Sequence, residues 1–110
     1  MIDKTVLNDL KQLLGNDFTL LIDAFFGDAE PIMVSLNDML VMDCDSVAQV
    51  SHSLKSISQN VGAISLSMMA AQLEQEARNG DVPDFEFKIQ ELSAMYQQVK
   101  NELKSMMADL

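Results

Sequence analysis

Residues that interrupt helices are scarce in this chain. Only two prolines and four glycines occur in 110 residues, beside nine methionines, one tyrosine and no tryptophan. Proline and glycine are the residues least compatible with a helix interior, whereas aromatic and β-branched residues favour strands. So few interruptions predict long helices joined by short turns, and therefore an all-α fold.

Apolar residues recur at helical spacing, every three or four positions, in five segments. The segments run from about Lys4 to Leu14, Asp17 to Met42, Asp45 to Asn60, Ala63 to Arg78, and Pro83 or Asp84 to Ala108. Asp3 is the expected N-cap of the first segment. Pro31 lies inside the second segment and predicts a kink or a helix restart capped by Asp28, because proline lacks a backbone donor.

The lengths of these segments and of the turns between them favour one architecture. Long amphipathic helices with short connections predict an up-and-down antiparallel four-helix bundle, with the short first helix as an extra N-terminal element. A chain of this length is expected to form a single domain over residues 1–110.

Charge and composition exclude several classes of function. Seventeen acidic residues against seven basic ones give a net charge of -10, which disfavours nucleic acid and anionic membrane surfaces as partners. The single Cys44 and the single His52 leave no set of ligands for a cysteine- or histidine-based metal site. There is no apolar run long enough to cross a bilayer and no signal-peptide pattern, so a cytoplasmic location is expected.

The only histidine occupies a distinctive place on the third predicted helix. At 100° per residue, an apolar stripe covers about 80° of the helix, and His52 lies about 180° from its centre. The stripe consists of Val47, Val50, Leu54, Ile57 and Val61. Lys55 is the only basic residue between Lys11 and Arg78, and it neighbours His52 on the helix surface at spacing i, i+3. An exposed histidine on a helix usually has no function beyond contact with solvent. The isolated lysine beside His52 instead favours a functional site that binds an anionic group.

The residues around His52 also form a motif. The run from Val50 to Ala63, VSHSLKSISQNVGA, is followed by Leu66 and Leu73-Glu74, and FFGDAEP precedes it at residues 25–31. This pattern resembles the signature of histidine phosphotransfer (Hpt) domains, in which His, Leu-Lys and Gly-Ala stand at fixed spacing. The resemblance covers nearly the whole chain. One position departs from it, since Ser56 stands where the family usually has glycine after the lysine.

The resemblance implies a role for each residue of the motif. His52 would accept a phosphoryl group from an aspartyl-phosphate of a response-regulator receiver domain and pass it to the aspartate of another. Lys55 would stabilise phosphoryl charge, and Gln59 would hydrogen-bond the phosphoryl group. Gly62 is expected to serve the helix end. The surface expected to contact partners includes Ala48, Gln49 and Ser56.

The sequence has no recognisable ATP-binding loop, so a phosphocarrier is expected rather than a kinase or other enzyme. No cofactor of its own is expected, and the receiver domain would supply Mg²⁺. Expected partners are receiver domains and a hybrid sensor histidine kinase, and the expected oligomeric state is a monomer.

Two alternatives stay open. The chain is either a carrier or, since Ser56 alters the motif, an Hpt-like adaptor that binds a receiver without accepting phosphate. It is either free-standing, as the Met1 start and the absence of linker composition favour, or a domain excised from a hybrid kinase.

Overall fold

Five helices make up the computed structural model, which describes residues 4–39 and 41–108. Their bounds are α1 Lys4–Leu14, α2 Asp17–Asn37, α3 Cys44–Asn60, α4 Ile64–Arg78 and α5 Phe85–Ala108. The described residues contain no strand. The predicted all-α fold is therefore confirmed.

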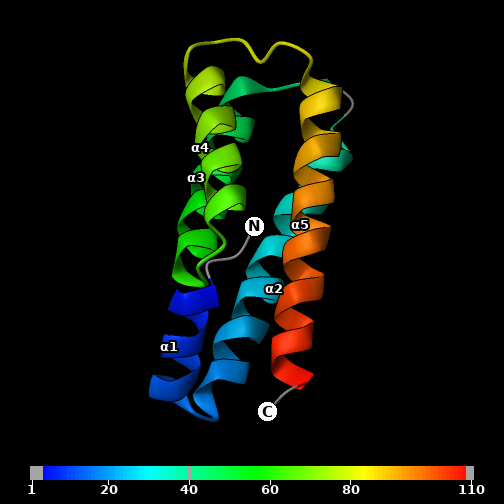
Figure 1. Cartoon of the computed structure of the whole chain (residues 1–110). Coiled ribbons are helices and arrows are strands. Elements are labelled where there is room, and N and C mark those ends of the chain that lie inside the picture. The colour runs from blue at the N-terminus through cyan, green and yellow to red at the C-terminus, as the bar shows by residue number, and fades with distance from the viewer. Residues whose placement is uncertain (1–3, 40, 109–110) are drawn as a thin grey trace.

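The helices alternate in direction along an elongated molecule of 42 × 21 × 18 Å. Helices α2 to α5 run up, down, up and down, and α2 and α5 span most of its length (Figure 1). The shorter pair α3 and α4 occupies the upper part, and α1 lies below that pair against α2. The antiparallel four-helix bundle with an extra N-terminal helix is thus confirmed.

The helix ends agree with the sequence prediction except in α2. The other helices begin and end within one or two residues of the predicted positions. Helix α2 ends at Asn37 rather than near Met42, where the N–H of Asp38 donates to the carbonyl of Val34 at 2.9 Å. The predicted cap Asp3 lies outside the described residues.

Helix α2 also runs through Pro31 as one element, so of the two outcomes predicted there, a kink or a restart capped by Asp28, the restart does not occur. Pro31 is exposed, while Ala29, Met33 and Leu36 are buried on the opposite side of the same helix. Burial of this apolar face on both sides of the proline stabilises one continuous helix, since tertiary packing supplies most helical stability in proteins.

A tight turn connects α3 to α4 and sets them antiparallel. Gly62 has a φ of +69°, a left-handed conformation that glycine adopts without a steric penalty. Its N–H donates to the carbonyl of Gln59 at 3.1 Å, and the N–H of Ala63 donates to that of Ser58 at 2.9 Å. This pair of bonds is a Schellman motif. The structural role predicted for Gly62 at the helix end is therefore what the geometry shows.

The buried face of α3 differs from the predicted stripe. Val47 and Leu54, and Val61 just after the helix, are buried as expected, but Val50 and Ile57 are only partly buried. The remaining buried residues of the helix are small: Ala48, Ser51 and Ser58. Helical geometry places the centre of this face about 70° from the predicted one, toward His52. The small side chains allow α3 to pack closely on α4, and this contact rotates the helix.

Candidate functional site

His52 lies in the middle of α3 at the edge of the α3–α4 interface, not at the pole opposite the core. Its side chain is 55% exposed, as the sequence predicted. One ring nitrogen, Nδ1, lies 3.0 Å from Oε2 of Glu74, which projects from the facing helix α4. The ring is therefore held at one nitrogen by a neighbouring helix.

Glu74 is a buried carboxylate with three partners. Its Oε1 accepts a hydrogen bond from Nζ of Lys55 at 3.0 Å. Besides facing His52, its Oε2 accepts from Nε and Nη2 of Arg78 at 2.9 and 2.7 Å. Glu74 thus joins the histidine of the motif to both of the neighbouring cations.

The charge state of Glu74 follows from these contacts. Burial opposes ionisation and by itself would raise the pKa, but the hydrogen bonds from Arg78 and Lys55 outweigh it. Together with the positive charge of Lys55, and that of the His52 ring whenever it is protonated, they lower the pKa of Glu74 from 4.5 to about 2. An ionised carboxylate only accepts hydrogen bonds, so Nδ1 of His52 carries the proton of the shared bond. In the neutral ring this tautomer leaves a lone pair on Nε2.

On the exposed side of α3, the position that follows Lys55 carries a small side chain, Ser56. Ser56, at the position where the family usually has glycine, turns its Oγ back to donate to the carbonyl of His52 at 3.2 Å. The hydroxyl is thereby paired within its own helix. Ser67 of α4 donates to the carbonyl of Lys55 at 3.2 Å and ties the two helices together beside the site.

The other predicted site residues are divided between surface and core. Gln49 and Gln59 are exposed on α3, and no hydrogen bond joins Gln59 to His52 within the described residues. Ala48, expected on the partner-binding surface, is only 5% exposed and packs in the core. That expectation is wrong because the buried face of α3 is rotated toward α4, which takes Ala48 inside.

Sequence reasoning missed Glu74 and Arg78 as site residues. The signal that points to Glu74 is its place among the buried positions of α4, where an acidic side chain is unusual. Those positions are Leu66, Ser67, Ala70, Leu73, Glu74 and Ala77. Arg78 stands at i+4 from Glu74, the spacing at which opposite charges pair on a helix. The contact with His52 needs the packing of α3 on α4.

Within the part of the chain that the structure describes, neither a candidate metal cluster nor a candidate membrane span is found. In residues 4–39 and 41–108 there is no group of three or more His, Cys, Asp or Glu side chains that could hold a metal ion. No helix in the same ranges is long and apolar enough to cross a membrane.

Comparison with known proteins agrees with this geometry. The Hpt domain model matches residues 20–102, which include α3, α4 and most of α2 and α5. The chain belongs to the Hpt domain family. A solved structure, histidine-containing phosphotransfer protein B (HptB) from Pseudomonas aeruginosa PAO1, matches with a TM-score of 0.90 and 26% identity. The match covers 99% of this chain and 96% of that chain. A comparison with curated proteins gives no match.

The family resemblance read from the motif is therefore confirmed, and with it a general role in histidine phosphotransfer within a phosphorelay. Hpt domains in phosphorelays interact with receiver domains and kinases. In this Hpt domain the only histidine, His52, is exposed and bound at Nδ1 by a carboxylate.

Proposed function

We propose that this Hpt domain is a phosphorelay intermediate that carries the phosphoryl group on Nε2 of His52. It accepts the group from an aspartyl-phosphate of one receiver domain and passes it to an aspartate of another. The observation that carries the proposal is the contact between Nδ1 of His52 and the ionised Glu74, on an otherwise exposed ring.

The transfer follows from this arrangement. The lone pair on Nε2 attacks phosphorus, a P–N bond forms, and the P–O bond to the donor aspartate breaks with its electron pair leaving on the carboxylate. The ring then carries positive charge, which Glu74 stabilises through the proton on Nδ1. The acceptor aspartate reverses these steps on the second receiver. Glu74 acts through the imidazole, so it is a positioning residue.

Lys55 is proposed to supply the positive charge that the phosphoryl group meets on His52. Its ammonium is bound to Oε1 of Glu74, on the carboxylate whose other oxygen faces His52. A held cation stabilises the negative oxygens of the phosphoryl group without moving during transfer. Gln59 lies one helical turn after Lys55 on α3. It is proposed to donate a hydrogen bond to the phosphoryl group once that group is bound.

The docking face for receivers is proposed to extend from His52 across α3 to α2. Gln49 and Ser56 are exposed on it, and a groove of about 500 Å³ follows between the two helices. The groove is lined by Asp28, Ile32, Gln49, Val50, Ser53 and Ile57. Asp28 is the only charged residue in this lining. The face therefore carries little negative charge that would repel the acidic pocket of a receiver, which also brings Mg²⁺. A hybrid sensor kinase would deliver the phosphoryl group through its own receiver.

The proposal is tested by incubating the protein with a phosphorylated receiver domain and following the label. We expect an acid-labile, alkali-stable phosphoprotein that is abolished in His52→Gln. Receiver binding without transfer, unchanged by His52→Ala, would instead support the adaptor alternative.

The role of Glu74 has a matched control on the same helix. Glu74→Gln keeps the shape but loses the charge that orients His52 and Lys55, and misplacement of reacting groups costs on the order of 10–100-fold in rate. Glu76→Gln removes a carboxylate that pairs with Lys88 instead, and it should transfer like the wild type. Equal rates for the two variants, both folded by circular dichroism, would refute the positioning role.

A further inference from the structure

A second groove lies at the upper end of the bundle, away from His52. It has a volume of about 580 Å³ and is formed by the start of α5 and the connection that follows α2. Its lining consists of Met39, Met42, Asp84, Phe85, Glu86, Phe87 and Gln90. No residue of α3 or α4 belongs to this lining, so a ligand there leaves the α3–α4 edge with His52 uncovered.

The apolar side chains of this end are unusually exposed. Phe87 is 60% exposed, and Val41, in the same connection as Met42, is 82% exposed. Met39 and Met42 are partly buried against the core. Flexible methionines beside an exposed aromatic ring form a surface that adapts to apolar side chains of different shape.

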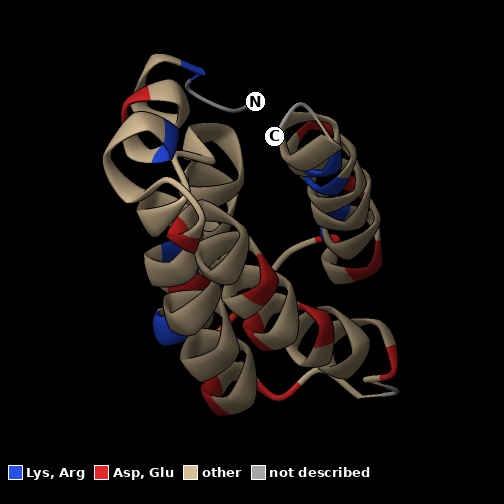
Figure 2. Ribbon diagram, turned by 90° about the horizontal axis from the view of Figure 1, so that it is seen from below, with Lys and Arg blue, Asp and Glu red and all other residues tan. Residues whose placement is uncertain are grey.

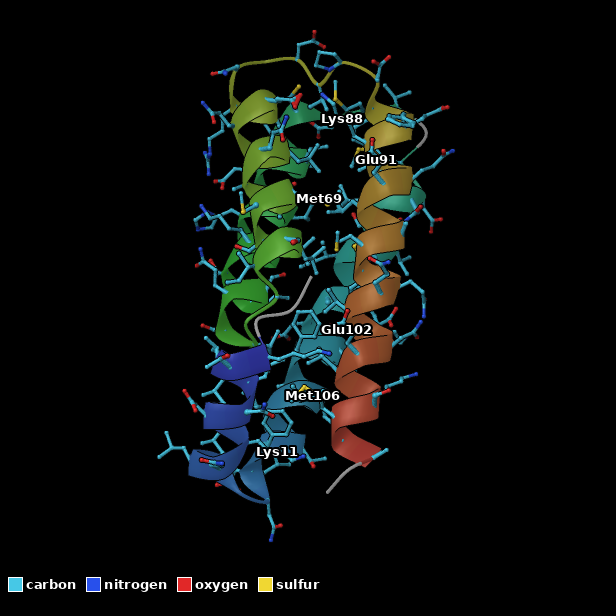
Figure 3. All side chains as sticks on the ribbon, in the orientation of Figure 1. Lys11, Met69, Lys88, Glu91, Glu102 and Met106 are labelled. Atoms are coloured by element: carbon cyan, nitrogen blue, oxygen red, sulfur yellow. The ribbon has the colours of Figure 1, made fainter. Side chains whose placement is uncertain are left out.

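The surroundings of the groove are acidic. Asp84 and Glu86 line it, and further acidic residues at this end of the bundle are Asp38, Asp43, Asp81 and Glu91. The two cations that lie closest in sequence to Asp84 and Glu86 form ion pairs with other carboxylates. Lys88 pairs with Glu76, and Arg78 pairs with Glu74. In Figure 3, Lys88 and Glu91 lie near the top of the molecule, far from Lys11 at the bottom.

The remaining lysines, apart from Lys55, gather at the opposite end. Lys4 and Lys11 belong to α1, and Lys100 and Lys104 to the last turns of α5. Figure 2, a view from that end, shows blue segments on the helix next to the N-terminus and on the helix that ends at the C-terminus. The molecule is therefore polarised, and its upper end attracts positive charge.

We propose that this groove docks a cationic amphipathic segment of a partner protein. Apolar side chains of the segment would contact Met39, Met42 and Phe87, and its Lys or Arg side chains would pair with Asp84 and Glu86. An anionic membrane or a second acidic end of this chain would meet like charge here. The position allows the segment to bind while a receiver occupies His52.

The test uses calorimetric titration of the full chain with an amphipathic helical peptide made of Leu and Lys. A peptide with Glu in place of Lys is the control. We expect the cationic peptide to bind, the acidic peptide not to bind, and affinity to fall as NaCl is raised, because salt screens exposed charges.

Variants locate the binding site. Phe87→Ser should weaken binding about tenfold, as truncation of an aromatic anchor typically does, and Glu86→Gln should weaken it less. Two matched controls lie at the other end of the molecule: Leu20→Ser, at a position that is 65% exposed, and Asp9→Asn. Both should bind like the wild type.

Three results would overturn the proposal: no binding of the cationic peptide, equal binding of the acidic one, or equal weakening by Leu20→Ser and Phe87→Ser. Phosphotransfer by Phe87→Ser should stay unchanged, so this proposal and the role of His52 can fail independently.

Discussion

Glu74 is the one charged side chain that is buried among the described residues. Its burial is stable because Lys55, Arg78 and His52 surround both carboxylate oxygens. An isolated buried carboxylate would be costly, whereas one with several hydrogen-bond donors stays ionised. The same contacts fix the tautomer of His52, so a single residue links the stability of the α3–α4 pair to the chemistry of the site.

The lowered pKa of Glu74 predicts a loss of stability in acid. The carboxyl titrates near 4.5 when unfolded and near 2 when folded, so its ionised form stabilises the folded state fully above pH 4.5. That contribution is lost as the pH falls from about 4.5 to about 2, because protonation then favours unfolding. Urea midpoints of the wild type and Glu74→Gln should differ at pH 7 and converge by pH 2. A difference that is the same at both pH values would contradict the assignment.

At the scale of helices, α3 and α4 form the closest pair, and small residues make this possible. Ser51 and Ser58 are fully buried, and their hydroxyls have no hydrogen-bond partner among the described residues. A buried hydroxyl without a partner is unfavourable. The serines therefore contribute through their small size, which brings Glu74 within reach of His52.

This predicts that the hydroxyls themselves are dispensable. Ser51→Ala and Ser58→Ala should leave the free energy of unfolding unchanged or raise it by up to about 1 kcal/mol, since they remove an unpaired group and keep the size small. Ser51→Val should lower it by about 1–3 kcal/mol through overpacking. Urea denaturation measures all three. Destabilisation by both alanine variants would show that the hydroxyls make stabilising contacts.

At the scale of the molecule, the His52 site and the lower end of the bundle, which α1 covers, are separate regions. Helix α1 packs on α2 below the α3–α4 pair, and Lys11 of α1 donates to the carbonyl of Met106 in α5 at 3.4 Å. Leu7 is the only fully buried residue of α1. The helix thus closes the lower end of the core without touching the His52 cluster.

Leu7→Ala should therefore separate stability from function. We expect a loss of about 2–5 kcal/mol in the free energy of unfolding, as for other buried leucines truncated to alanine. The rate of phosphotransfer at a temperature where the variant stays folded should match that of the wild type. A slower transfer by the folded variant would show that α1 influences the site.

Much of this protein is determined locally by its sequence. The apolar periodicity predicts the five helices, and the positions of Gly15, Gly62 and Gly80 predict where α1, α3 and α4 end, because these are properties of neighbouring residues. The motif around His52 predicts the family and an exposed histidine beside a lysine. These features need no knowledge of how the helices pack.

Only the tertiary structure decided which face of each helix is buried and which neighbouring helix that face contacts. Helix α2 passes through Pro31 because its apolar face is buried on both sides of the proline. Helix α3 turns its small residues to α4, which buries Ala48 and brings His52 to Glu74 across 22 positions of sequence. Contacts between helices depend on the total fit of side chains in the core, and a periodic pattern within one helix does not contain that information.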